Sequence, residues 1–529
     1  MKRVPATARR GNLALAVVAA GVFLAALDQT MVVTVLPSIL RDLHISFTRL
    51  DDAAWIVTGY LLGYTVAMPL FGRIADVHGR RLMYLVSLAI FAGGSVLCVF
   101  AGGLQPLVAA RIVQAAGGGA VVPIAMALAA DLLPARRLAL AIGLIGAAGE
   151  AGGVLGPLYG AILAHQWGWR SIFLVNVPLS VLLAVGSWYL LPREARTPRP
   201  APVPDTPAGN TDLATVPPLP GTKPGDRARE RVDYAGAALL ALALAGLTIG
   251  LGSSTQSGGV PVRPWWLAVS AVALATFIAW EIRVRQPLVR LGLFRKRSFA
   301  AANVANFAVG AALIVGMVEI PLYAYSLLGM GEVSGGLLLL RMTVMIPVGA
   351  LVGGAVAGRL GYRATGVAGF ALITVGYLLV SRWPDIPSNL RMTLDLLVTG
   401  LGFGLVIAPI GASVIESVGT RWSATGSAVV TVMRMIGMMV GLASLSSWGL
   451  RRFDELMAGT SLPLQTGGMS DAQYQALTKA YEHALEAALH TVYSQFFAIA
   501  AVVAALAIIP ALLFRRRTKG DGHVTFVPQ

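Results

Sequence analysis

Several ionisable side chains stand inside long apolar runs of this sequence, and six of them fall into pairs of opposite charge. These six are Asp28, Arg111, Glu150, Glu319, Arg341 and Arg434. Placing such a group at membrane depth costs at least about 2.5–3.5 kcal/mol on insertion scales, so each one is a candidate for function. We estimated how deep each of these side chains lies in its apolar run, and each acidic residue lies at about the same depth as a basic one. The sequence therefore predicts three acid–base pairs, namely Asp28 with Arg111, Glu150 with Arg434, and Glu319 with Arg341.

Two interpretations of these pairs stay open. A carboxylate that is desolvated in a cavity can bind a proton near neutral pH, and a basic neighbour competes with that proton. On this interpretation Asp28 is the proton carrier and Arg111 its modulator. Glu150 and Arg434 come from opposite halves of the chain, so their pairing would latch the halves. The alternative is that each pair is a fixed ion pair that only holds helices together.

Other kinds of chemistry find no support in the sequence. The P-loop needs a Gly-Lys dipeptide, and the sequence has none. The metalloprotease motif H-E-x-x-H and the hydrolase motif G-x-S-x-G do not occur either. The single cysteine, Cys98, and the scattered histidines lack ligand spacing. We expect no enzyme, no metal and no cofactor, and an ion gradient as the energy source.

The composition points to a membrane. Only 12% of the 529 residues are charged and 56% are hydrophobic, whereas a soluble domain carries about 25% charged residues. The net charge of +16 lies in short segments between apolar runs, which indicates membrane orientation rather than nucleic-acid binding. Lys and Arg concentrate on one side, so both termini are predicted to be cytoplasmic.

The apolar runs predict an all-α polytopic protein with fourteen spans, because each is near the roughly 20 residues that cross a bilayer. They lie near residues 13–36, 52–72, 82–101, 105–131, 138–163, 169–192, 234–253, 264–281, 298–328, 332–357, 364–381, 392–415, 424–450 and 487–514. This divides the chain into an N-terminal six-helix bundle (1–192), a Pro-rich cytoplasmic linker (193–232), an inserted helix pair with a basic segment (233–297), a C-terminal six-helix bundle (298–514) and a cytoplasmic tail (515–529).

An external extension is predicted at residues 451–486, within the second bundle. Ser470 followed by Gln473 is typical of a capping box. The helix that it starts is predicted to run into the last span, with Leu477, Tyr481, Leu485 and Leu489 forming one apolar face.

The two bundles carry related loops. Gly72, Asp76, Gly79, Arg80 and Arg81 follow the second span, and Gly354, Gly358, Arg359, Gly361 and Arg363 occupy the same place in the second half. Paired repeats of this kind build many secondary transporters. Glycines such as Gly152, Gly156 and Gly160 allow close helix packing.

The sequence resembles members of the major facilitator superfamily. Its motifs occur in the order typical of that family and cover nearly the whole chain. The loop from Gly72 to Arg81 resembles motif A, the cytoplasmic gate motif, and the run from Arg111 to Gln114 resembles motif B. Motif C, the antiporter signature, is matched by Gly152, Gly156, Pro157 and Gly160. Two departures are Ala115 and Ala161, where glycine is common in motifs B and C.

The finer resemblance is to the fourteen-span EmrB/QacA branch of drug:proton antiporters. The span-one motif Leu27 to Pro37 and the segments Trp169 to Pro178 and Pro287 to Phe294 carry it. Residues Trp55 to Tyr64 and Trp448 to Phe453, with Glu150 and Arg434, are similar to mycobacterial triacylglyceride and multidrug exporters.

That resemblance implies a monomeric, proton-coupled exporter of hydrophobic substrates in the bacterial inner membrane. Lipids such as triacylglycerides are the expected cargo, with a periplasmic lipid-binding lipoprotein as partner. A proton-coupled multidrug antiporter on the same scaffold is the alternative.

Overall fold

The computed structural model describes most of the chain. The described residues are 6–44, 50–132, 135–192, 233–251, 264–284, 287–288, 291–418, 423–460 and 470–514. The Pro-rich linker and the C-terminal tail, both expected in the cytoplasm, lie outside them, as does the side chain of Asp76.

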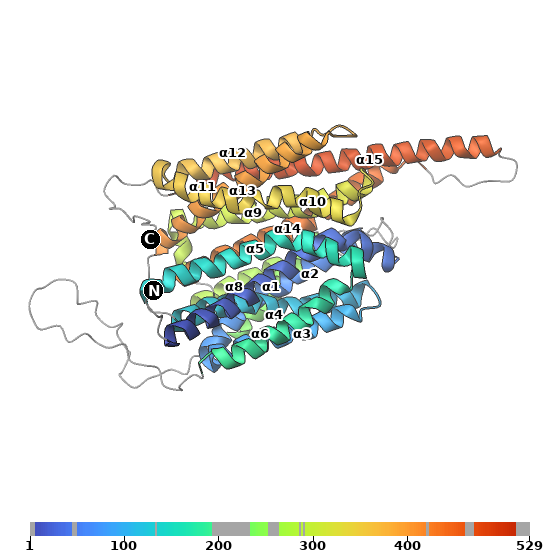
Figure 1. The fold of residues 1–529 in the computed structure, drawn as a ribbon. Helices are drawn as coiled ribbons and strands as arrows, with labels where there is room; N and C mark the ends of the chain where they lie inside the picture. Colours follow the sequence, from blue (N-terminus) through green and yellow to red (C-terminus); the bar gives the residue numbers. More distant parts are fainter. Residues whose placement is uncertain are drawn as a thin grey trace, which may run out of the picture.

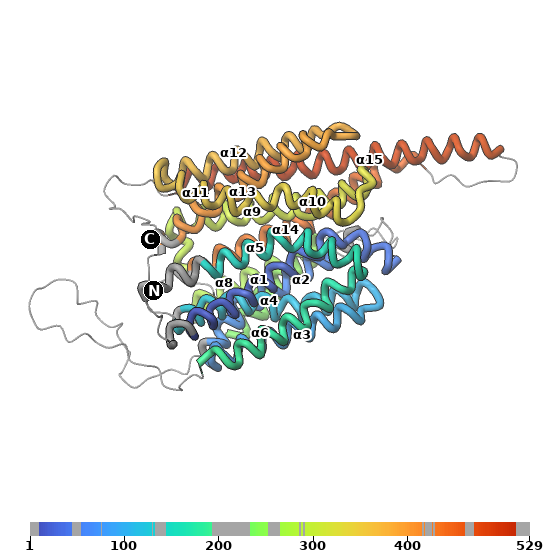
Figure 2. Tube along the Cα trace, in the orientation of Figure 1, coloured from blue at the N-terminus to red at the C-terminus, as the bar shows by residue number. Residues whose placement is uncertain are grey.

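Long helices form both halves of the described chain (Figures 1 and 2). The first half comprises α1 (Ala6–Asp42), α2 (Leu50–His78), α3 (Arg80–Val99), α4 (Leu104–Leu132), α5 (Ala135–Trp167) and α6 (Ser171–Leu190). The inserted segment holds α7 (Tyr234–Leu251), α8 (Pro264–Arg283) and the short 3-10 helix η2 (Leu291–Arg295). The second half comprises α9 (Arg297–Ser326), α10 (Glu332–Thr343), α11 (Met345–Leu360), α12 (Tyr362–Val380), α13 (Asn389–Val418), α14 (Ser423–Met457), α15 (Asp471–Leu506) and α16 (Ile508–Ala511).

Each predicted span coincides with a helix or a helix pair, because apolar runs of this length can satisfy their backbone groups in lipid only as helices. Thirteen segments in the described residues are long and apolar enough to cross a membrane. α5, which covers the predicted span 138–163, is not among them, although it has 33 residues. The described side chains of α5 begin at Leu144, so the apolar start of its predicted span, residues 138–143, lies outside the described part of the helix. The structure thus supports thirteen or fourteen spans.

Two spans are interrupted one turn before a proline. A proline ring clashes with the carbonyl group four residues earlier in a helix. Pro347 therefore opposes helix continuation at Thr343, where α10 ends, and Pro510 does the same at Leu506, where α15 ends. In both cases a second helix continues the span after a one-residue break.

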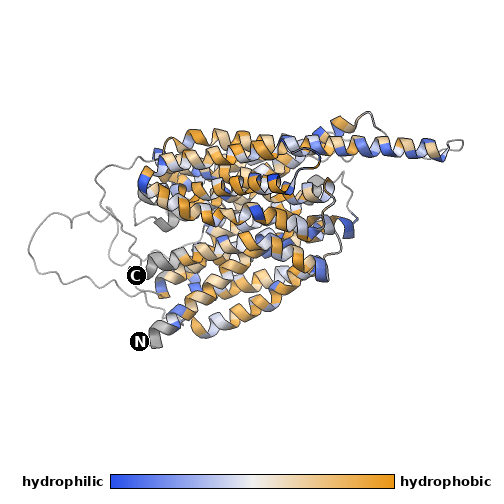
Figure 3. Ribbon diagram, turned by 45° about the horizontal axis from the view of Figure 1, so that its top comes forward, coloured by the Kyte–Doolittle hydropathy of each residue, from blue (hydrophilic) through white to orange (hydrophobic). Residues whose placement is uncertain are grey.

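The two halves meet along two seams, one between α2 and α14 and the other between α5 and α10. The inserted pair lies outside the first seam, because α7 contacts α2 and α14 while α8 packs on α7. This peripheral position agrees with an insertion that breaks neither repeat. Apolar residues cover the bundle, and polar ones gather toward its two ends and along the projecting part of α15 (Figure 3).

The related loops of the two halves share a backbone conformation as well as a sequence pattern. Gly79 has φ 103° and precedes α3, and Gly361 has φ 85° and precedes α12. These values lie where residues with a Cβ atom are disfavoured, so glycine is required at both sharp turns. The internal repeat predicted from the sequence therefore has a structural counterpart.

The predicted extension is a real projection of α15 beyond the other helices (Figure 1). Ser470 caps α15 as expected, because its hydroxyl accepts from the Gln473 backbone N–H at 3.3 Å while the Gln473 side chain accepts from Ser470 N–H at 3.1 Å. Leu477 of the predicted apolar face is 48% exposed, whereas Tyr481, Leu485 and Leu489 are half-buried. Residues 461–469 of the extension lie outside the described part.

A ridge of glycines on α5 holds α1 close. Gly152, Gly156 and Gly160 are spaced by four residues, and a Cβ atom at any of them would collide with the backbone of α1. At Gly160 the added atom would lie 2.6 Å from the carbonyl oxygen of Met31. The glycines of the motif C resemblance therefore set the spacing between α5 and the helix that carries Asp28.

We predict that Gly160→Ala lowers the thermal unfolding midpoint of the detergent-purified protein, since overpacking costs about 1–3 kcal/mol. Gly153→Ala is the matched control, because a Cβ atom there meets nothing within 4 Å and alanine favours helix by up to about 1 kcal/mol. Equal midpoints for the two variants would contradict the close-packing role.

Candidate functional site

Asp28 and Arg111 form an ion pair inside the first half, as their depths predicted. The Arg111 Nη1 atom lies 2.7 Å from Asp28 Oδ2, and both side chains are buried. Asp28 is on α1 and Arg111 is on α4, so the pair joins two helices of one bundle. A buried pair of this kind persists only when further hydrogen bonds satisfy its remaining polar atoms.

Two amides, one on α4 and one on α6, supply further bonds to the carboxylate, whereas Arg111 Nε has no hydrogen-bond partner among the described residues. Asp28 Oδ1 accepts from Gln114 Nε2 at 2.9 Å and from Asn176 Nδ2 at 2.6 Å. Gln114 also donates to Ser95 Oγ at 2.8 Å and accepts from Arg111 at 2.6 Å. We call Asp28, Arg111, Gln114, Asn176 and Ser95 the Asp28 network.

An aromatic wall completes the network. The Arg111 guanidinium lies 4.0 Å from the centre of the Tyr60 ring and 5.5 Å from that of Phe173. A desolvated cation gains from such faces. The sequence indicated the ion pair, but it did not indicate that Gln114 and Asn176 complete it. The one sign of Gln114 and Asn176 in the sequence is that each is a polar side chain inside an apolar span.

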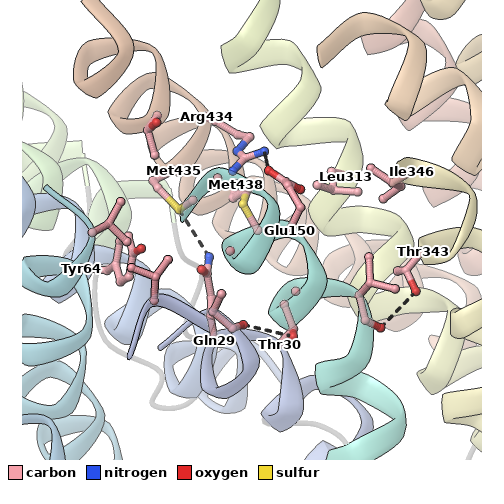
Figure 4. A pocket seen from close by; sticks show the side chains of 18 of the residues that line it. Gln29, Thr30, Tyr64, Glu150, Leu313, Thr343, Ile346, Arg434, Met435 and Met438 are labelled. Carbon is pink, nitrogen blue, oxygen red and sulfur yellow. Dashed lines mark hydrogen bonds and ion pairs between the residues drawn. The ribbon is translucent and has the colours of Figure 1, made fainter. Parts of the chain in front are cut away.

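The second predicted pair lies between the halves. Arg434 Nη1 on α14 is 3.3 Å from Glu150 Oε1 on α5. The side chains are 24% and 39% exposed, so this pair is far more open than the pair of Asp28 and Arg111. It borders a central pocket of about 170 Å³ that side chains from both halves line (Figure 4).

The rest of the central pocket is mostly apolar. Four methionines line it, namely Met126, Met317, Met435 and Met438. Gln29 and Thr30 contribute polar atoms from α1, and Gln29 Nε2 donates to Met435 Sδ at 3.3 Å (Figure 4). Methionine is flexible and polarisable, so it adapts to apolar ligands of irregular shape. Asp28 is not among the lining residues, although it is only one position from Gln29.

The predicted pair of Glu319 and Arg341 is wrong. Arg341 Nη1 donates instead to Asn389 Oδ1 and Thr393 Oγ1 on α13, both at 2.7 Å. Glu319 is buried, and none of the residues that the structure describes forms an ion pair with it. The two residues share a depth, but Arg341 lies on the side of α10 that faces α13. Depth alone does not fix the direction in which a helical side chain points.

The motif A loop is held by its arginines. Arg80 lies 2.7 Å from Asp131 at the end of α4 and also donates to the Ala127 carbonyl at 3.0 Å. Arg81 donates to the Trp188 carbonyl at the end of α6. Gly72 lies in α2 near Pro123 of α4. The role predicted for Asp76 falls on a side chain outside the described part.

A further ion pair joins the halves at the end from which α15 projects. Arg41 Nη2, in the last turn of α1, lies 3.2 Å from Glu332 Oε1 at the start of α10. The Arg41 guanidinium also lies 5.5 Å from the centre of the Tyr325 ring. Sequence reasoning missed this pair, because charges at the ends of spans are common and carry no sign of a partner.

Comparison with known proteins identifies the family. The model of the Major Facilitator Superfamily matches residues 18–442, which is most of the chain. The chain belongs to the major facilitator superfamily. It is therefore a transporter by family, and the described residues contain no group of three His, Cys, Asp or Glu side chains suited to a metal ion.

Curated relatives within this superfamily are named triacylglyceride transporters. The chain is 36% identical to one from Mycobacterium tuberculosis, over 94% of its own length and 93% of the relative's. It is 38% identical to one from Mycolicibacterium hassiacum, over 85% and 82% of the two chains.

Solved structures show the same fold at low sequence identity. A bacterial homologue of the human lysosomal transporter Spinster, in an inward-facing conformation, has a TM-score of 0.63 and 16% identity, with 98% of this chain and all of that one covered. The D-xylose–proton symporter has a TM-score of 0.57 and 13% identity, with 93% and 96% covered.

We predict that locking Arg41 to Glu332 stops transport, because rocking of one half against the other would have to separate them. The test joins Arg41→Cys and Glu332→Cys with a short reducible cross-linker in a Cys98→Ser background. Transport should stop on cross-linking and return on reduction. Before cross-linking the variant should stay active, because Arg41 is 60% exposed and Glu332 is 10% exposed, and replacing both partners leaves no unpaired buried charge.

The matched control is the pair Asp42→Cys and Arg170→Cys. These residues form an ion pair at the same end of the molecule but within one half, so linking them should leave transport unchanged. Transport that continues with Arg41 and Glu332 linked would show that this contact is not part of the moving interface.

Proposed function

We propose that this transporter is a proton-coupled secondary active exporter of hydrophobic substrates, with lipids such as triacylglycerides as its cargo. It would lie in the bacterial inner membrane as a monomer with both termini in the cytoplasm, and move substrate toward the periplasm. The observation that carries the proposal is the central pocket, which is methionine-rich, lies between the halves and contains one ion pair that joins them.

The proton would be carried by Asp28. Its carboxylate faces a cation, Arg111, and two amide donors, so protonation would release Arg111 and change the contacts among α1, α4 and α6. Glu150 and Arg434 would latch the halves, because a substrate or proton entering the central pocket meets their charges directly. The proton gradient would serve as the energy source without any cofactor.

An apolar path supports a lipid cargo. The central pocket reaches Val154 on α5, Thr343 on α10 and Ile346 on α11, which belong to the seam that the inserted pair leaves uncovered. Beside that seam, Leu155 and Val348 are more than two-fifths exposed. A lipid could pass between the bilayer and the pocket here without crossing a charged surface. The other seam is covered by α7.

Delivery would use the projection of α15. Moving acyl chains into water costs about 0.8 kcal/mol per CH₂ group, so a triacylglyceride must be handed over under cover. The half-buried Tyr481 and Leu485 on α15 offer apolar surface beyond the bundle. We propose that a periplasmic lipid-binding lipoprotein docks there.

A proton-coupled multidrug antiporter of the EmrB/QacA branch is the second candidate. The central pocket has a volume of about 170 Å³, which is smaller than the roughly 300–1,000 Å³ of pockets that hold drug-sized ligands. Either cargo therefore requires the halves to open, and the smaller opening that a drug needs supports this candidate. A triacylglyceride would require a larger opening of the halves than a drug would. The two candidates differ in whether export needs the projection.

We predict that shortening the projection abolishes lipid export and spares drug export. The variant lacks residues 451–457 of α14 and 475–481 of α15, which removes about two turns from each helix and leaves the membrane part intact. If the shortened projection exposes only two more CH₂ groups of the lipid to water, the transfer costs about 1.6 kcal/mol more. This corresponds to a more than tenfold lower rate of lipid export.

The measurement uses proteoliposomes with an imposed proton gradient, labelled triolein and acceptor vesicles. The same vesicles are assayed with ethidium, which leaves through water and serves as the internal control for folding and coupling. Unchanged triolein export by the shortened protein would overturn the handover and favour the multidrug antiporter.

A further inference from the structure

A second apolar groove lies on the outer surface of the first half, away from the central pocket. It has a volume of about 610 Å³ and lies between α3 and α6, which run side by side along one edge of the molecule (Figure 1). Eight residues line it, all of them apolar or aromatic, and they are Leu82, Leu85, Val86, Ala89, Ala184, Val185, Trp188 and Tyr189. None of them lines the central pocket.

Two arginines stand at one end of this α3–α6 groove. Arg81 donates to the Trp188 carbonyl, and its guanidinium lies 4.9 Å from the centre of the Trp188 ring. Arg10 Nη2, on α1, donates to the Tyr189 carbonyl at 2.9 Å. The last carbonyls of a helix carry partial negative charge, so the end of α6 fixes both guanidinium groups beside the groove. The eight described residues that line the groove include no carboxylate.

The groove lies at the level where a membrane meets water. Trp188 and Tyr189 are 53% and 70% exposed, and such aromatic residues favour the headgroup level of a bilayer. Leu82 and Val185 are also about half exposed, on helices whose sides face outward. One end of the groove is therefore suited to an anionic headgroup and its length to an acyl chain.

We propose that the α3–α6 groove binds an anionic phospholipid, with one acyl chain along Leu82, Val185 and Trp188 and the headgroup phosphate at Arg10 and Arg81. Basic pockets between membrane helices select anionic headgroups in this way. A triacylglyceride carries no charge and makes no use of the two arginines, so the occupant differs from the proposed cargo.

Such a lipid would tie together three points of the first half. Arg10 is in the first turns of α1, Arg81 is the motif A arginine in the first turn of α3, and both already contact the end of α6. An anionic headgroup would form charge-assisted hydrogen bonds with both guanidinium groups. The bound lipid would therefore stabilise this end of the bundle, and its binding does not depend on which substrate is transported.

The test measures quenching of tryptophan fluorescence by lipids with brominated chains. The protein is reconstituted in phosphatidylcholine vesicles that contain either brominated phosphatidylglycerol or brominated phosphatidylcholine with the same chains. Every lipid-facing tryptophan is quenched by both lipids, so the signal of interest is the excess quenching by phosphatidylglycerol. Trp188→Phe removes the reporter in the groove and should abolish that excess.

Arg10→Gln and Arg81→Gln should each weaken the preference for phosphatidylglycerol by roughly fivefold, the effect expected for one arginine near an anionic surface. Arg363→Gln is the matched control, because Arg363 holds the position of Arg81 in the second repeat and should leave the preference unchanged. Arg10 is exposed, so Arg10→Gln is a variant whose folding should not suffer.

Three results would overturn the proposal. The first is equal quenching of the wild-type protein by the two lipids. The second is excess quenching by phosphatidylglycerol that survives in Arg10→Gln and in Trp188→Phe. The third is a loss of this preference in Arg363→Gln as large as in Arg10→Gln, which would indicate general attraction to basic residues. Because this experiment measures lipid binding, its outcome does not depend on the outcome of the transport assay.

Discussion

The ion pair between Asp28 and Arg111 is the interaction on which the first half depends. An uncompensated charge at this depth would be costly, and both carboxylate oxygens of Asp28 are matched by groups from α4 and α6. The glycine ridge of α5 lets α1 pack closely against α5, and this contact holds the helix that carries Asp28 in position. Motifs B and C therefore act on one carboxylate, the first by bonding to it and the second by positioning its helix.

The two inter-helix pairs that the sequence predicted correctly have different surroundings. The pair of Asp28 and Arg111 is enclosed within one half, while the pair of Glu150 and Arg434 borders the central pocket and joins the halves. The first suits storage of a proton away from substrate, and the second suits a contact that substrate can break. Arg41 and Glu332 close the halves at the end where α15 projects. We propose that the three pairs together couple events in one bundle to the relative position of the two halves.

The sequence predicted the helices well, because hydropathy over about 20 residues reports burial in lipid directly. It predicted pairs by depth, which succeeded for Asp28 and Glu150 and failed for Glu319, since depth carries no information about helix face. Gln114 and Asn176 were found only in the structure because an amide in a span has many possible partners. The α3–α6 groove was also beyond prediction, as it depends on how two outward-facing helices are spaced.

The most direct test of the account is uphill export by Asp28→Asn in proteoliposomes with an imposed proton gradient. Removing one partner of a buried pair destabilises by about 3–5 kcal/mol, so a variant that also carries Arg111→Gln removes both charges and guards against misfolding. Asp395→Asn, at a buried aspartate of the second half, is the matched control. We predict that both Asp28 variants still bind substrate but lose gradient-driven export, and that Asp395→Asn keeps it. Gradient-driven export by a folded Asp28 variant would contradict the claim that this carboxylate carries the proton.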